Sequence, residues 1–177
     1  MHAIGAQVFD LDAATNAHAT VPCQIAYDNS SAELDGLEQP WEGNTWCNFP
    51  FSQPPPWIEK ALREAYRCRS ITLLGPMDPS TDWNQLITRA CDAFAVWPRR
   101  EHFSLPNEDE EGRLPNGRKR SKSPPGAIAL YYIGPQSNAW MRIMRDDYSC
   151  AVYHGRIDGL RPIVLKAPKR PRRLEDL

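Results

Sequence analysis

The chain has 177 residues, of which 41% are hydrophobic, and it carries a formal net charge of −1. This length suits one domain with a sizeable core, and the hydrophobic content excludes a chain that is disordered throughout. No apolar run reaches the roughly 20 residues that cross a bilayer, and the first residues lack the basic start and long apolar stretch of a signal peptide. We therefore expect a cytoplasmic protein.

The cysteines indicate neither a disulfide framework nor a metal centre. Their number is odd and no C-x-x-C pair occurs. They stand at wide spacings, at Cys23, Cys47, Cys68, Cys91 and Cys150. The histidines are equally scattered, so we predict that the protein holds no metal.

The small net charge hides an asymmetry along the chain. Residues 1–60 are acidic, with Lys60 as their single basic residue, whereas basic residues outnumber acidic ones in residues 61–177. This division indicates an acidic region near one site and a basic surface near another, and a basic surface suits nucleic acid. The alternative is that solvated faces of opposite charge happen to segregate.

The first part of the chain contains two short predicted strands separated by irregular sequence. Residues 8–12 alternate apolar and polar side chains, which is typical of a strand. Residues 16–44 are polar and contain prolines and glycines that break regular structure. Residues 45–47 form a brief β-prone run.

Two helices are predicted next. Apolar residues fall at helical spacing over residues 57–66, with Lys60 on the polar face, and Pro56 is suited to open this helix. Residues 52–55 before it are expected to be irregular. A second helix is predicted over about residues 80–92. The tryptophans on the two apolar faces are predicted core residues: Trp57 and Trp83.

Three further apolar runs predict strands. Residues 71–74 read as a buried strand that ends at Gly75-Pro76, and residues 93–97 form another. Residues 127–133 form a long final strand. Between the last two, residues 104–125 are low in complexity and highly charged, so we expect a mobile loop.

The pattern is less regular after residue 135. We expect a short helix near residues 138–148, a strand at 162–165 and a basic, proline-rich tail. The predicted organisation is one domain over residues 1–135 and a C-terminal extension over residues 136–177.

Alternating strands and helices favour an α/β fold, with a mostly parallel sheet and helices on its faces. Ligands in such sheets bind beyond the carboxyl ends of the strands. Residues 12–14, 48–51 and 75–76 each follow a predicted strand. We therefore expect these three segments to lie along one edge of the sheet.

The segment Asn48-Phe49-Pro50-Phe51 resembles the Asp/Asn/Ser-Pro-Pro-aromatic tetrapeptide of DNA amino-methyltransferases. The amine of a base is a poor nucleophile, because its lone pair is delocalised into the ring. The resemblance implies that the Asn48 side-chain oxygen and the Phe49 carbonyl accept the two amino hydrogens, and that Phe51 stacks on a flipped base. Phe49 replaces the first proline, which restores an N–H and frees φ, although Pro50 still favours extended backbone there.

Further matches along the chain make the resemblance specific to the DNA N6-adenine methyltransferases of bacteriophages. The matches run in the family's order over roughly residues 8–134. They comprise Phe9, Leu11 to Ala14, Asp35 to Leu37, Trp41, Trp46 to Ser52, Pro56 to Ala61, Leu73 to Pro76, Asp82-Trp83 and the strand after Gly126. The resemblance implies a Rossmann-like methyltransferase fold, which we expect to be reduced in size. It also implies a protein of phage or prophage origin that acts in a bacterial host cell.

The resemblance also implies S-adenosylmethionine as the methyl donor. Asp12, Ala13 and Ala14 match the segment where small residues let the donor approach and an acid binds its amino group. Asp10 alternates to the same face, and Asp28 and Asp35 are candidates for its ribose hydroxyls. In the alternative reading, Asp12 caps a turn at the end of a strand.

A DNA substrate implies contacts with backbone phosphates, for which the basic residues of the charged loop and its flank are candidates. They are Arg99, Arg100, Arg113, Arg118, Lys119, Arg120 and Lys122. The expected activity is methylation of the N6 amine of a flipped adenine. The alternatives are N4-cytosine methylation and a catalytically impaired methyltransferase-fold protein that binds DNA or a protein partner.

Overall fold

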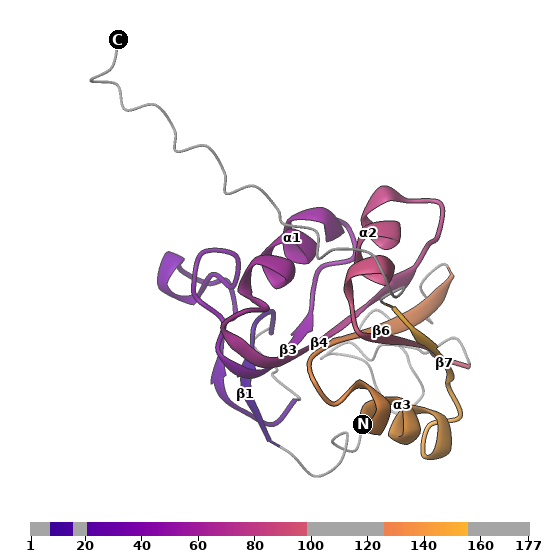
Figure 1. The fold of residues 1–177 in the computed structure, drawn as a ribbon. Helices are drawn as coiled ribbons and strands as arrows, with labels where there is room; N and C mark the ends of the chain where they lie inside the picture. The colour runs from indigo at the N-terminus through magenta and orange to yellow at the C-terminus, as the bar shows by residue number, and fades with distance from the viewer. Residues whose placement is uncertain (1–7, 16–20, 99–125, 156–177) are drawn as a thin grey trace, which may run out of the picture.

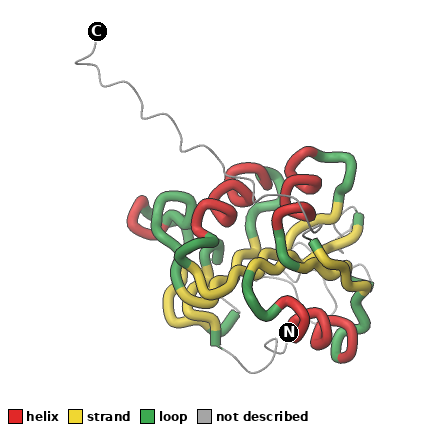
Figure 2. Tube along the Cα trace, in the orientation of Figure 1, coloured by secondary structure: helices red, strands yellow, loops and turns green. Residues whose placement is uncertain are grey.

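The computed structural model describes residues 8–15, 21–98 and 126–155. These residues form one seven-stranded sheet, with α1 and α2 on one face and α3 on the other (Figures 1 and 2). The strands are β1 Phe9–Asp12, β2 Cys23–Ala26, β3 Gly43–Asn48, β4 Cys68–Met77, β5 Ala93–Val96, β6 Ala127–Ile133 and β7 Ala151–His154, and the α-helices are α1 Pro54–Glu64, α2 Asp82–Ala90 and α3 Ser137–Asp146.

The sheet combines a parallel part with an antiparallel part. Its strand order is β2-β1-β3-β4-β6-β5-β7. The pairs from β2 to β4 are parallel, whereas β6 runs antiparallel to both β4 and β5, and β7 runs antiparallel to β5. Strands β1 to β5 therefore all point the same way. This confirms the predicted α/β class, and the architecture is consistent with a Rossmann-like methyltransferase sheet.

Helix α1 begins earlier than predicted, at Pro54 rather than Pro56. Three prolines fit its first turn because the first N–H groups of a helix have no intrahelical acceptor in any case. Trp57 is buried, as predicted. Lys60 was expected on the polar face, but it is only 6% exposed, and its Nζ lies 2.9 Å from Glu64 Oε1.

Strand β4 continues through Gly75 and Pro76, so the prediction that these two residues end the strand is wrong. Its neighbour β3 ends at Asn48, which is opposite Leu74, whereas β6 pairs with β4 as far as Met77. From Gly75 onward one edge of β4 is therefore unpaired. A proline is tolerated in a strand at such an edge.

Two strands lie where none was predicted. β2 falls within residues 16–44, which were expected to be irregular, and β7 falls after α3. Both are edge strands with largely exposed side chains, so neither shows the alternation that marks a half-buried strand. Because β7 pairs with β5, the sheet extends beyond residue 135. The predicted loop at 104–125 and strand at 162–165 lie outside the described residues.

The sheet separates two apolar clusters, one on each face. The first packs α1 and α2 on the sheet around side chains such as Ile71, Ile87 and Tyr131. The second packs α3 on the opposite face through Trp140 and Met144. Burial on both faces explains why the central strands read as nearly continuous apolar runs.

Ile71 and Ile25 allow a matched test of this core. Ile71 is fully buried in β4, whereas Ile25 is 56% exposed on edge strand β2. We expect Ile71→Ala to lower the free energy of unfolding by about 2–5 kcal/mol. Ile25→Ala is expected to change it by no more than about 0.5 kcal/mol. Urea denaturation measures both, and equal losses would contradict the described sheet.

Candidate functional site

The candidate site lies where the strand order reverses. From β1 the chain passes to β2 on one side and then returns to β3 on the other side of β1. β1 and β3 are parallel neighbours, with Asp12 opposite Trp46, and the Ala13 N–H donates to the Trp46 carbonyl over 2.8 Å. Ligands of open α/β sheets bind at such a reversal, beyond the carboxyl ends of the strands.

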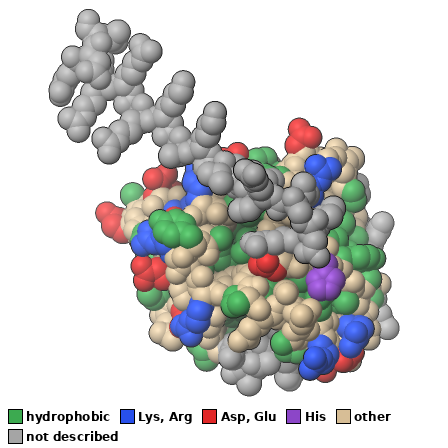
Figure 3. Space-filling model, in the orientation of Figure 1, with side chains coloured by type: hydrophobic (Ala, Val, Ile, Leu, Met, Phe, Trp, Pro, Cys, Tyr) green, Lys and Arg blue, Asp and Glu red, His purple; other side chains and the backbone are tan. Residues whose placement is uncertain are grey.

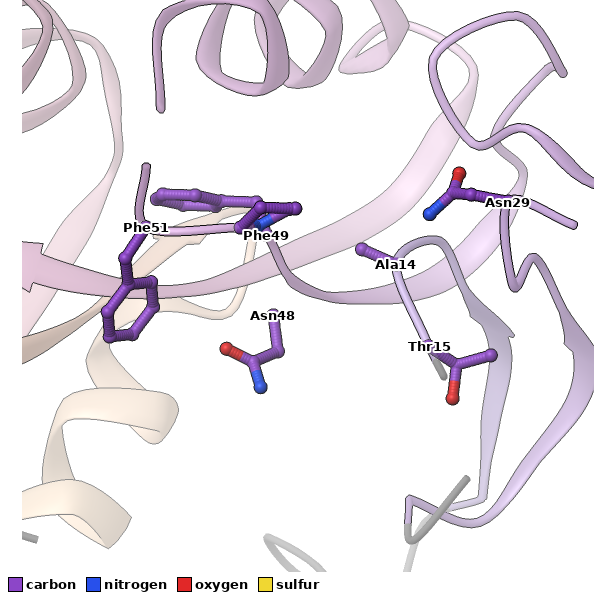
Figure 4. Close-up of a pocket in the computed structure, with 7 residues that line it drawn as sticks. Ala14, Thr15, Asn29, Asn48, Phe49 and Phe51 are labelled. Carbon is purple, nitrogen blue, oxygen red and sulfur yellow. The ribbon is translucent and has the colours of Figure 1, made fainter. Parts of the chain in front are cut away.

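A pocket of about 320 Å³ occupies this position. It is lined by residues at or just after the ends of β1, β2 and β3 (Figure 4): Ala14, Thr15, Asn29, Asn48, Phe49, Pro50 and Phe51. The expected common edge therefore exists for the segments after β1 and β3. Gly75 and Pro76 do not line the pocket, and Gly75 instead contacts the buried ring of Phe49.

The Asn48 side chain is exposed and points into open space between Phe51 and Thr15 (Figure 4). It makes no hydrogen bond with any other residue that the structure describes. Asn48 is the last residue of β3, so the strand fixes its backbone. Its side-chain oxygen is of the kind that can accept a hydrogen bond from a ligand amine.

The Phe49 side chain points away from the pocket and into the core. It is 1% exposed. Its ring centroid lies 6.4 Å from that of Trp83 and 6.1 Å from that of Phe51, both in edge-to-face geometry. The Phe49 contribution to the pocket edge is thus its backbone, which is the part that the predicted role requires.

Asp12 does not line the pocket, but it contacts Ala14, which does. Asp12 is 3% exposed, and its Oδ1 accepts the Ala14 N–H over 3.2 Å. Burial raises the pKa of this carboxyl, while hydrogen bonds from Ala14 and Thr15 oppose the shift. Asp12 therefore makes the turn-capping contact that the sequence offered as an alternative to donor binding. The hydrogen bonds described for this carboxyl come from neutral groups.

Asn29 lines the pocket and was not among the predicted site residues. It follows β2 in the left-handed backbone region, with φ of 58°, which asparagine adopts more readily than most residues. Its Oδ1 accepts the Gly36 N–H over 3.1 Å, so its amide nitrogen is directed toward the pocket (Figure 4). A prediction of β2 would have pointed to Asn29, because this residue follows β2 at the same edge of the sheet as the ends of β1 and β3.

Asp10 lies farther back along β1, in a polar network. Its Oδ2 accepts the Asn44 N–H over 2.7 Å and pairs with Arg69 Nη2 at 3.2 Å, and its Oδ1 accepts from Gln24 over 3.1 Å. It does not line the pocket.

Asp28 and Asp35 each accept a hydrogen bond from the backbone N–H two residues further along the chain. Asp28 Oδ1 accepts the Ser30 N–H over 3.0 Å, and its hydrogen bonds with Ser30 lower the pKa of the carboxyl. Asp35 Oδ1 accepts the Leu37 N–H over 2.9 Å. Neither lines the pocket, although Asp28 directly precedes Asn29.

The predicted DNA-contacting residues lie outside the part of the chain that the structure describes: Arg99, Arg100, Arg113, Arg118, Lys119, Arg120 and Lys122. On the face drawn in Figure 3, acidic and basic side chains are interspersed. Within residues 8–15, 21–98 and 126–155, no group of three or more His, Cys, Asp or Glu is placed to hold a metal, and no helix there could span a membrane.

A mixed sheet with a parallel part, and a pocket at its point of reversal edged by an amide and an aromatic ring, is consistent with the Rossmann-like methyltransferase class. Residues 2–120 match the family described as DNA N-6-adenine-methyltransferase (Dam). The chain belongs to this family, which confirms the resemblance that its motifs predicted.

A curated relative supports the same family. The DNA N-6-adenine-methyltransferase of Escherichia phage T1 is 35% identical over 77 residues, which cover 42% of this chain and 31% of that protein. The chain thus matches about a third of the length of this relative. No solved structure matches the chain.

The Asp12 carboxyl predicts a specific pH dependence. Its pKa is raised above the ordinary value of 3.8, so the folded protein holds this proton more tightly than the unfolded chain does. The contribution of Asp12 to stability therefore falls as pH rises from about 3.8 through the raised pKa. We expect Asp12→Asn to be more stable than the wild type at neutral pH, and this gain should disappear as pH approaches the ordinary value.

Asp28→Asn provides a control of opposite sign. The pKa of Asp28 is lowered, so its contribution to stability is present above 3.8 and is lost as pH falls through the lowered pKa. Urea denaturation of both variants over a series of pH values measures the two trends. A shift of the free energy of unfolding in the same direction for both variants at neutral pH would contradict the raised pKa of Asp12.

Proposed function

We propose that this protein transfers a methyl group from S-adenosylmethionine to the N6 amine of adenine in DNA. The observation that carries the proposal is the edge of the pocket at the reversal of strand order. There the Asn48 amide is exposed without a hydrogen-bond partner among the described residues, next to the Phe49 backbone and the Phe51 ring. Membership of the adenine-methyltransferase family supports the same chemistry.

The proposed chemistry uses two hydrogen-bond acceptors and one ring. The Asn48 Oδ1 and the Phe49 carbonyl each accept one hydrogen of the adenine amine. Drawing both hydrogens away from the ring plane steers the nitrogen toward tetrahedral geometry and makes its lone pair available. Phe51, half-buried at the mouth of the pocket, stacks on the flipped base.

The residues after β1 suit the donor. S-adenosylmethionine would supply a methyl group on a sulfonium, and its methionine part carries an ammonium. Asp12 is a desolvated carboxylate with neutral described contacts, and an opposite charge nearby would stabilise its ionised form. Ala14 lines the pocket beside it, whereas Ala13 is buried in the core, and the Asn29 amide is placed to donate to a ligand oxygen. We assign Asp12 to the donor's ammonium and Asn29 to one of its oxygens.

Donor binding tests this assignment. We expect the wild-type protein to bind S-adenosylmethionine in calorimetric titration, and Asp12→Asn to weaken binding by about tenfold or more, because a hydrogen bond to a charged group is lost. Asp146→Asn is the control, since Asp146 is exposed on α3 and pairs with Arg145. If the wild type binds no donor, the enzymatic proposal is wrong.

The acceptor role of Asn48 is tested by Asn48→Ala. Methyl transfer to duplex DNA should fall by about 10²-fold or more, since one acceptor of the reacting amine is lost, while donor affinity is retained. Asn138→Ala, at an exposed position of α3, should leave both unchanged. Asn48 has no part in the mechanism if its variant loses both properties equally or neither.

Base-resolved digestion of the methylated DNA identifies the acceptor base. N6-methyladenine is the expected product. N4-methylcytosine would show instead that the same amide and carbonyl serve a cytosine amine.

A further inference from the structure

The Phe49 side chain occupies a recess formed by β4 and α2. Only 1% of the residue is exposed, and the ring edge meets Trp83 from α2 at a centroid distance of 6.4 Å and an interplanar angle of 80°. On its other side the ring meets Phe51 at 6.1 Å and 60°. The Phe49 ring thus contacts both the core, at Trp83, and Phe51, the aromatic residue at the mouth of the pocket.

Gly75 makes this recess possible. If it carried a Cβ, that atom would overlap Cζ of Phe49 and lie 3.0 Å from Cε1 and 3.1 Å from Cε2. The backbone of Gly75 is ordinary strand, so the glycine is required by the approach of the ring rather than by its conformation. Phe49 and Gly75 therefore fit each other: the large side chain of one fills the space that the other leaves.

We infer that Gly75 and Trp83 are positioning residues for methyl transfer, and that the seated Phe49 ring replaces the first proline of the family tetrapeptide. This inference rests on the proposed function. A proline would fix the loop by restricting φ at position 49. Here the buried ring fixes the same residue from its side chain, and Pro50 restricts the backbone that follows.

The consequence falls on the groups that contact the base. The Phe49 carbonyl belongs to the residue whose ring is seated. Asn48 precedes it and Phe51 follows two residues later, in direct ring contact with Phe49. A shift of the ring must therefore move the carbonyl and disturb both neighbours. Displacement of reacting groups by about 1 Å is sufficient to slow catalysis by about 10²-fold.

Gly75→Ala tests the inference, because the new methyl group must displace the ring. We expect kcat for DNA methylation to fall by about 10²-fold, while KM for S-adenosylmethionine changes by less than about twofold. Trp83→Leu should produce a smaller effect of the same kind. Phe49→Pro should also lower kcat, because it empties the recess.

A second-site variant separates positioning from general damage. In Gly75→Ala/Phe49→Leu, the shorter side chain leaves room for the methyl group and keeps the carbonyl, so activity should exceed that of Gly75→Ala alone. Gly134→Ala is the matched control. A Cβ there would lie 2.7 Å from Tyr132 Oη and 2.9 Å from Ser70 Cβ, which also forces a neighbour to shift but at the opposite edge of the sheet. It should keep kcat near the wild-type value.

The outcomes distinguish this inference from the proposed function. If the wild type methylates DNA but Gly75→Ala retains its kcat, or the double variant shows no recovery, the positioning role is overturned and the function stands. If the wild type transfers no methyl group, the proposed function is overturned. In that case, fluorescence of 2-aminopurine at the target base reports loop geometry without catalysis, and an identical response from wild type and Gly75→Ala overturns the positioning role as well.

Discussion

The parallel pairing of β1 with β3 is the constraint on which the site depends. The hydrogen bond from the Ala13 N–H to the Trp46 carbonyl extends this pairing one residue beyond the end of β1. It brings the end of β1 beside the end of β3, although more than 30 residues separate them along the chain. β2 lies on the other side of β1, and the pocket lies beyond the neighbouring ends of β1 and β3.

The two sides of this opening have different physical characters. On the β1 side, burial of Asp12 raises its pKa, and this desolvation outweighs the hydrogen bonds from Ala14 and Thr15. Such a carboxylate gains from a cationic ligand. On the β3 side, the Asn48 amide is exposed and neutral, which suits a neutral amine. The ends of these neighbouring strands therefore carry two different polar groups, a buried carboxyl beside the pocket and an exposed amide on its edge.

The departure from the family tetrapeptide has a structural explanation. Phe49 loses the φ restriction of a proline, but its ring packs between Gly75 and Trp83 in a close-packed core. We therefore expect substitutions at positions 49, 75 and 83 to be coupled, although the first two are 26 positions apart along the chain. The exposed face of the loop retains the amide, the carbonyl and the aromatic ring.

The sequence by itself determined the α/β class, the central strands, the helices and the family, because burial on one face leaves a local period in the chain. It did not reveal β2 or β7, whose exposed edges carry no such period. It misplaced the end of β4, because a proline there is tolerated only where the neighbouring strand has stopped. Only the tertiary structure placed Asn29 at the pocket and Phe49 against Gly75, because these contacts join residues whose proximity depends on strand order rather than on any local pattern.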